Sequence, residues 1–369
     1  MTAASPSAGR RFEVTLGRPF VSPLFDLALI GGGLSLPVLW LVLVPPDLPG
    51  LRALSTGLRS LAGPAALPYA VMLTVGAHFA ASTVRLYTKQ GTTTALPFLT
   101  LAFPLVALLV VSVAVFQPDV VGRQLQSLYL TWSPYHYAAQ AYGLAVMYCY
   151  RSGCALGDGD KQLLRAASLL PFLYSFLSTT GAGLHWILPD SLYEIPAFVS
   201  VLATLRPILR VAGLAAPFLL WLKLQRGGSG PMPIVSVLLL LVNGVWWYAL
   251  DPIEAFVWAT FFHGIQYLAI VIIFHVKEQL ARPGARHGAL YHTLWFYGVC
   301  LLLAYALFDC LPQVYMWAGA SVTQSLLIVA AAINLHHFIV DGFIWRLGRR
   351  DANRAVVDSG VPTAPATAA

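Results

Sequence analysis

Long apolar runs constrain this chain more than any other feature of its sequence. A helix needs about 20 apolar residues to cross roughly 30 Å of hydrocarbon. We find ten such runs, at 22–44, 62–86, 94–116, 124–150, 162–185, 197–223, 233–250, 252–276, 290–309 and 320–346. They are continuously apolar and do not alternate with polar residues, so they predict helices and not the strands of a membrane barrel. We therefore expect an all-α, polytopic transmembrane helical bundle.

The composition agrees with a protein whose main partner is a lipid bilayer. Hydrophobic residues make up 58% of the chain and charged residues 10%, whereas soluble domains are about 25% charged. The mean hydropathy is +0.72. A water-soluble fold is excluded by these values.

The basic residues predict how the bundle sits in the membrane. Cytoplasmic loops are enriched in Lys and Arg, and 17 of these residues fall on one side of the ten runs. Three fall on the other side, Arg52, Arg59 and Arg123, and Arg206 and Arg210 lie inside the sixth run. This bias predicts ten spans with both termini in the cytoplasm, in a bacterial inner membrane. It also accounts for the net charge of +7 without a nucleic-acid partner.

The ends of the chain carry few other signals. We expect a cytoplasmic N-terminal segment over 1–21, the transmembrane domain over 22–346 and a disordered cytoplasmic tail over 347–369. The first apolar run begins past residue 20 and has no small-residue cleavage site, so no cleavable signal peptide is expected. The four cysteines form no C-x-x-C pair, which predicts neither a disulfide framework nor a zinc knuckle.

Histidines recur at depth in the even-numbered apolar runs. They are His78, His136, His263, His275, His336 and His337. An ionisable side chain in hydrocarbon costs free energy unless it meets a partner, a metal or the bundle interior, so these residues predict a functional site. A helix rises 1.5 Å per residue, so the depth of each histidine can be counted from the Lys or Arg at the cytoplasmic end of its run. This count places His78, His336 and His337 in one layer. The same estimate places His136 and His263 one or two turns deeper.

Polar neighbours accompany these histidines at helical spacing. Gln140 follows His136 by four residues, and Gln266 and Tyr267 follow His263 by three and four. Such pairs share a helix face. Asp341 follows His337 by four residues, and a carboxylate there can orient a ligating imidazole. The alternative is a structural polar pair that joins two helices.

Several imidazoles with one carboxylate suit iron, copper or zinc better than magnesium or calcium. We therefore expect a metal-dependent oxidoreductase that acts on a lipophilic substrate, with an electron donor as a further partner.

In its plan the chain resembles the Brp/Blh carotene-cleaving proteins, which are helical bundles with histidines on several spans. The resemblance rests on His78, His136, His263, His336 and His337. It implies an oxygenase that uses dioxygen, with one or two iron ions held by these five residues. Asp341, Gln140 and Gln266 would be accessory groups, Tyr267 would line the same face and His275 would be a further candidate ligand. The H-x-x-x-H and H-x-x-H-H boxes of membrane desaturases are not found in the sequence.

Two other functions use many of the same residues. Histidines on facing helices can hold haem axially for electron transfer. A transporter can use His, Asp341, Arg206 and Arg210 as a proton or substrate path. Arg206 and Arg210 can bind a substrate carboxylate or a haem propionate, or they can reach the outer headgroups of the bilayer.

Overall fold

The structure is a computed structural model that describes residues 14–44, 53–54, 56–57, 67–227, 230–345 and 352–359. The predicted basic residues Arg52 and Arg59, and most of the predicted tail, lie outside the described residues. Within the described residues the regular structure is entirely helical, which confirms the all-α prediction.

Helices lie within each of the ten predicted apolar runs. The helices are α1 (Pro23–Phe25), α2 (Ser35–Leu43), α4 (Leu67–Val71), α5 (Ala77–Thr88), α6 (Thr92–Ala95), α7 (Phe103–Phe116), α8 (Arg123–Arg151), α9 (Asp158–Ser178), α10 (Leu184–Ile187), α11 (Pro196–Arg226), α12 (Ile234–Ala249), α13 (Pro252–Leu280), α14 (Ala289–Tyr305), α15 (Leu311–Trp317), α16 (Val322–Ile344) and α17 (Ala352–Asp358). Short π-helical turns extend several of them, at Asp26–Ile30, Met72–Gly76, Phe98–Ala102, Pro118–Gly122 and Ala306–Cys310. Side chains that accept backbone N–H groups start α13 at Asp251 and α16 at Ser321.

Five helical segments are long and apolar enough to cross a membrane by themselves. They are Phe98–Phe116, Pro196–Arg226, Pro252–Leu280, Ala289–Trp317 and Val322–Ile344. The pair Pro23–Ile30 and Ser35–Leu43 is bent by 49° and makes a sixth segment if it is counted as one span. Helices that are long and apolar enough to span a membrane are thus present, although fewer than ten meet these criteria among the described residues.

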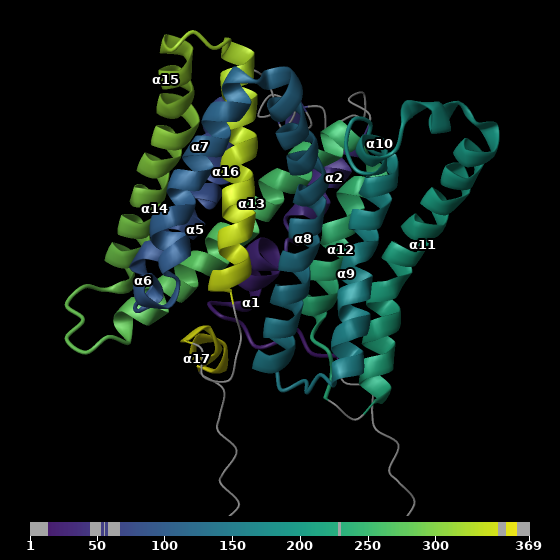
Figure 1. The fold of residues 1–369 in the computed structure, drawn as a ribbon. Helices are drawn as coiled ribbons and strands as arrows, with labels where there is room; N and C mark the ends of the chain where they lie inside the picture. The colour runs from purple at the N-terminus through teal and green to yellow at the C-terminus, as the bar shows by residue number, and fades with distance from the viewer. Residues whose placement is uncertain are drawn as a thin grey trace, which may run out of the picture.

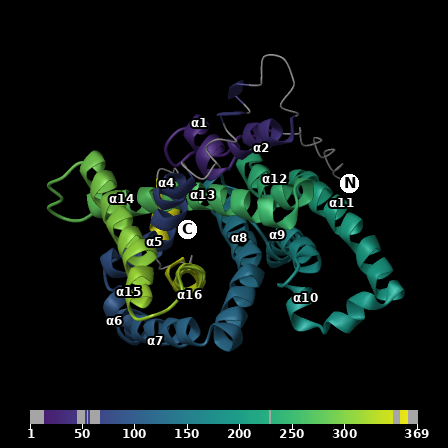
Figure 2. The ribbon, with the colours of Figure 1, turned by 90° about the horizontal axis from the view of Figure 1, so that it is seen from above.

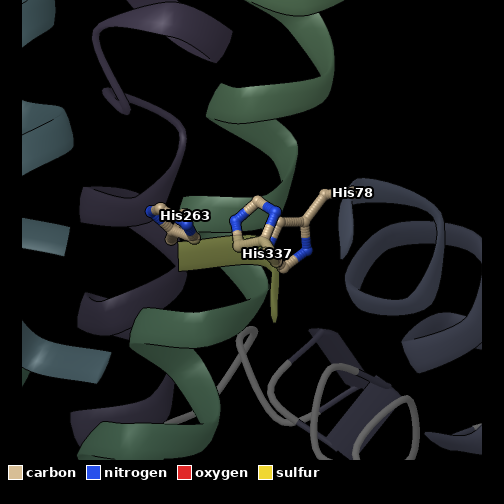
Figure 3. Close-up of side chains that lie close together, drawn as sticks. All are labelled: His78, His263 and His337. Atoms are coloured by element: carbon tan, nitrogen blue, oxygen red, sulfur yellow. The ribbon is translucent and has the colours of Figure 1, made fainter. Parts of the chain in front are cut away.

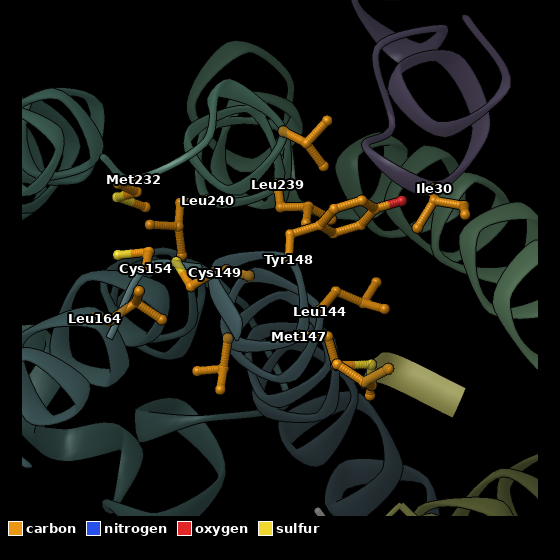
Figure 4. Close-up of a cluster of buried hydrophobic side chains, with 14 of the residues drawn as sticks. Ile30, Leu144, Met147, Tyr148, Cys149, Cys154, Leu164, Met232, Leu239 and Leu240 are labelled. Carbon is orange, nitrogen blue, oxygen red and sulfur yellow. The ribbon is translucent and has the colours of Figure 1, made fainter. Parts of the chain in front are cut away.

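The helices form a bundle in which α5, α8, α13 and α16 surround the centre (Figures 1 and 2). α16 packs against α5, α7 and α8, and α13 packs against α5, α12 and α14. α9, α11 and α12 form the part of the bundle beyond α8. Figure 4 shows the largest cluster of buried apolar side chains, which lies between α8, α9 and α12 and includes Leu144, Tyr148 and Leu240. One face of α8 thus packs against α9 and α12, and another face packs against α16.

Two buried arginines hold the segment before α1 and the helix α17 against the bundle. Arg151 donates to the carbonyls of Pro19, at 2.8 Å, and of Val357, at 2.9 Å. Arg85 contacts Glu278 and Asn353, each at 2.8 Å. The expected disordered tail therefore contains a packed helix, α17. The sequence lacks a clear helical period there, and the order comes from buried contacts made by Arg85 and Arg151.

Candidate metal centre

Four buried histidines from four helices meet at the centre of the bundle. They are His78 on α5, His136 on α8, His263 on α13 and His337 on α16, and each is at most 8% exposed. The ring of His78 lies 5.1 Å from that of His263 and 5.0 Å from that of His337, between centroids. The ring of His136 lies 5.1 Å and 4.9 Å from the same two rings. Figure 3 shows His78, His263 and His337 turned toward one another. The four side chains form one cluster.

The cluster corrects the two-layer depth that we estimated from the sequence. One helical turn is 5.4 Å, so side chains that extend toward the bundle axis can bridge a difference of about one turn. The estimate also assumed that the four helices start at equal depth and stay regular, whereas a π-helical turn, Met72–Gly76, precedes His78.

Two of these histidines and Asp341 bring three potential ligand atoms into a small triangle. His337 Nε2 lies 3.2 Å from His136 Nε2. Asp341 Oδ2 lies 3.5 Å from His337 Nε2 and 3.7 Å from His136 Nε2. Metal–nitrogen bonds of about 2.0–2.1 Å separate neighbouring ligand atoms of a tetrahedral site by roughly 3.3 Å. The three atoms, which we call the His–Asp triangle, thus already have the spacing of metal ligands.

A second group shares His337 and adds unpartnered nitrogen atoms. The ligand atoms of His78, His263 and His337 lie within 4.8 Å of one another. Among the described residues, Nε2 of His78 and Nε2 of His263 have no hydrogen-bond partner. Nδ1 of His78 likewise has no hydrogen-bond partner within the described part of the chain. Unsatisfied buried polar atoms cost about 1–3 kcal/mol each, and these nitrogens are available to bind an ion.

The neighbours of Asp341 hold its carboxylate in a fixed orientation. Tyr267 donates from its hydroxyl to Asp341 Oδ1 at 2.7 Å. Trp345 donates from Nε1 to the same hydroxyl at 3.2 Å, and the guanidinium of Arg85 lies 4.7 Å from the centre of the Trp345 ring. Oδ1 is therefore occupied, and Oδ2 faces the two imidazoles. The sequence predicted Asp341 and Tyr267 as site residues, and the structure brings both to the cluster.

The two predicted glutamines lie beside the cluster and contact backbone. Gln140 donates from Nε2 to the carbonyl of His263 at 3.4 Å. Gln266 lies against Gly32, where an added Cβ would be 2.5 Å from its Nε2. These contacts connect α8 with α13, and α13 with the turn before α2, so both glutamines position the helices that carry histidines.

Two predicted histidines lie away from the cluster. His336 stacks on Phe103 with 4.9 Å between ring centroids, because consecutive helical residues point about 100° apart. His275 stacks on Trp295 at 5.8 Å, about 18 Å along α13 from His263. The structure therefore does not group them with the other four histidines.

The two arginines of the sixth apolar run also lie elsewhere. Arg206 donates to the carbonyl of Leu177 at 3.0 and 2.6 Å, and Arg210 is exposed on α11. Among the described residues, neither takes part in the His–Asp triangle or in the second histidine group.

Sequence reasoning missed two residues that shape the cluster. Ser82 lies 2.8 Å from Nδ1 of His337, between Oγ and the ring nitrogen. Gly264 leaves room for His78, since a Cβ at this position would be 2.9 Å from His78 Nδ1. Ser82 follows His78 by four residues, so its shared helix face was the signal that could have found it.

A cavity of about 560 Å³ adjoins the His–Asp triangle. His136 and Asp341 line one part of it, and its other lining residues come mainly from α8 and α16, with Tyr267 and Ile270 from α13 and Lys161 from α9. We call this cavity the α8–α16 groove. Its volume lies within the roughly 300–1,000 Å³ of small-molecule sites.

Comparison of the chain with protein-family models, curated proteins and solved structures found no match.

Proposed function

We propose that this protein is a metal-dependent oxidoreductase of the oxygenase type that acts on a lipophilic substrate within the membrane. The observation that carries the proposal is the His–Asp triangle, in which two imidazole nitrogens and a carboxylate oxygen lie 3.2–3.7 Å apart without an intervening protein atom in any of the three contacts. Two histidines with one carboxylate and open positions are typical of non-haem iron oxygenases.

The proposed metal is iron, held by His136, His337 and Asp341. His78 and His263 would complete the set or hold a second ion, because their unpartnered nitrogens lie next to His337. When bound, iron would supply redox chemistry with dioxygen. The protein supplies the buried setting, the fixed carboxylate and the adjoining groove for an apolar substrate. This assignment agrees with the resemblance to the Brp/Blh proteins in using several membrane histidines.

The short nitrogen–nitrogen distance argues for a metal ion over haem. Two axial bonds of about 2.0 Å would hold imidazole nitrogens roughly 4 Å apart on opposite sides of a macrocycle. Nε2 of His136 and Nε2 of His337 are 3.2 Å apart, while His78 packs against the ring of His337 and His263 packs against the ring of His136. A macrocycle between His136 and His337 would have to push the four histidine rings apart.

We further propose the complete topology of ten spans with both termini in the cytoplasm of a bacterium, in its inner membrane. Helices on all ten predicted apolar runs and the bias of 17 basic residues toward one side support it. Reporter fusions in successive loops test this topology, and two neighbouring loops reported on the same side would contradict it.

One purification in mild detergent tests the metal proposal. We expect stoichiometric iron by elemental analysis and no Soret absorption band. His337→Ala, His136→Ala and Asp341→Asn should each reduce the iron content, whereas His275→Ala, which removes a buried imidazole outside the cluster, should not. A Soret band would instead indicate haem, and folded, metal-free protein would favour a transporter.

A further inference from the structure

The α8–α16 groove is long and has different chemistry at its two ends. It follows α8 from Trp132 to Tyr150, which is about 27 Å of helix. Among the described residues that line it, those that carry or can gain a charge near neutral pH are His136, Asp341 and Lys161. His136 and Lys161 lie at different ends, because Tyr150, beside Lys161, is about 21 Å along α8 from His136.

The two ends also differ in their contact with solvent. The side chains of His136 and Asp341 are 9% and 7% exposed, whereas that of Lys161 is 34% exposed. Between the ends the lining is mostly apolar and includes Gly143, Val146 and Met147. A ligand that matches this pattern has a long apolar chain and one polar head.

Cationic groups gather at the Lys161 end. Arg354 lies with its guanidinium carbon 4.3 Å from the centre of the Tyr150 ring and pairs through Nε with the half-exposed Asp358 at 2.9 Å. Lys161 contacts Asp158 at 3.1 Å, and this carboxylate raises the pKa of Lys161 above its ordinary value. Asp158 is 95% exposed, and ion pairs at such a surface are weak, so an anionic ligand can compete for Lys161.

A second carboxylate next to Lys161 in the sequence, that of Asp160, is already engaged. Asp160 accepts from the ammonium of Lys223 on α11, which holds the pKa of Asp160 below its ordinary value. Asp160 therefore does not neutralise Lys161. The Lys161 end remains suited to an anionic head.

Small exposed residues leave the groove open along its side. Ala139 on α8 and Gly342 on α16 line it and are exposed. A Cβ added to Gly143 or to Gly342 would meet no atom within 4 Å. A chain in the surrounding bilayer can thus enter sideways, and a larger side chain at either glycine would occupy this space without a clash at its Cβ.

From these features we infer that the groove binds a single-chain amphiphile with an anionic head, such as a long-chain fatty acid, with the head at Lys161 and the chain extending to His136 and Asp341. That this molecule is the substrate rests on the proposed function, whereas its binding in the groove does not. The site of reaction would then lie about 20 Å from the head. A substrate without a head, or a bilayer phospholipid, would not need Lys161.

Tryptophan quenching by a brominated long-chain fatty acid tests the inference directly, because Trp132 and Trp345 line the groove. We expect saturable quenching that is largely lost when both are replaced by Phe. Lys161→Gln should weaken binding about fivefold while Lys161→Arg retains it. The brominated alcohol of the same length should bind as weakly as the acid binds to Lys161→Gln.

Glycine variants provide a matched test of position. Gly342→Leu and Gly143→Leu should abolish quenching, whereas Gly298→Leu, on α14, should not, since its Cβ also meets no atom within 4 Å but lies outside the groove. Equal binding of the acid and the alcohol would overturn the inference. It would also be overturned if brominated phospholipid in nanodiscs quenched Trp132 and Trp345 as strongly as the acid does.

The quenching measurement needs neither metal nor activity, so it separates the two proposals. Metal-free protein that binds the acid as described would overturn the proposed function and leave the binding inference standing. Iron-loaded protein that does not bind the acid would overturn the inference alone.

Discussion

Oγ of Ser82 lies 2.8 Å from Nδ1 of His337, and this contact links the hydroxyl of Ser82 to the position of the proton on the His337 ring. Ser82 donates its only hydroxyl hydrogen to the carbonyl of Phe79 at 3.1 Å. A serine hydroxyl that donates to this carbonyl accepts from Nδ1–H of His337. Nε2 of His337 is then left with a free lone pair, which faces His136 and Asp341 as a metal ligand requires.

Ser82→Ala should weaken metal binding because it removes the group that fixes this tautomer. Loss of an outer partner of a ligating histidine typically costs about 10–100-fold in affinity. Competition with a chelator, followed by elemental analysis, measures the change. Ser325→Ala is the matched control, since Ser325 is equally buried on α16 but its hydroxyl has no partner among the described residues. Equal metal affinity in both variants would show that Ser82 does not act through His337.

Tyr267→Phe should release the carboxylate of Asp341 and lower metal affinity by about tenfold or more. The hydroxyl of Tyr267 is the donor to Asp341 Oδ1 and the acceptor for Trp345. Tyr315→Phe removes a comparable hydrogen bond, to Ser112, which involves no residue of the cluster. Both variants should lose about 1 kcal/mol of unfolding free energy, but only Tyr267→Phe should lose metal. A loss of metal in both would point to a general loss of stability.

Gly264→Ala should disturb the cluster through His78. The new Cβ would be 2.9 Å from Nδ1 of His78 and 3.4 Å from the carbonyl of Thr74. Overpacking of this kind costs about 1–3 kcal/mol, so we expect a lower melting temperature together with lower metal content. Gly298→Ala, in a helix where the Cβ meets nothing within 4 Å, should be neutral or slightly stabilising. A Gly264→Ala protein as stable and as metal-rich as Gly298→Ala would mean that His78 can move freely.

The helices were predictable because apolar runs of this length have few other structures available to them in a membrane. The central site was predictable in part for the same reason. His78, His136, His263 and His337 stand out against hydrocarbon, and Asp341 shares a helix face with His337. Helical spacing alone was enough to connect these last two residues.

The rest of the site depends on how helices distant in sequence face each other. His336 and His337 are adjacent in the chain, yet one stacks on Phe103 and the other joins the cluster. Which of the two faces inward is set by the packing of α16 on α5 and α8. Ser82 and Gly264 are ordinary residues in the sequence, and their roles arise only from the side chains that tertiary packing brings against them.

The ion pair of Asp160 and Lys223, which joins α9 to α11, should make stability depend on pH in the acid range. Asp160 is 15% exposed and also accepts from the backbone N–H of Gly157 at 3.2 Å. Lys223 holds the pKa of Asp160 below its ordinary value of 3.8 in the folded protein. The folded state therefore takes up this proton less readily than the unfolded state, so the contribution to stability is complete above about pH 3.8 and is lost as the pH falls through the lower folded value. Because Lys223 is 52% exposed, we expect a contribution of no more than about 1 kcal/mol.

Thermal unfolding of Asp160→Asn in a nonionic detergent measures this contribution. Its melting temperature should be lower than that of the unmodified chain at pH 6–7, by about 2–4 °C or less, and the difference should disappear well below pH 3.8. Asp158→Asn serves as the control, since Asp158 is 95% exposed and pairs only with Lys161 among the described residues. A difference for Asp160→Asn that stays constant from pH 7 down to pH 3 would mean that the lost stability comes from packing at this position and not from the ion pair.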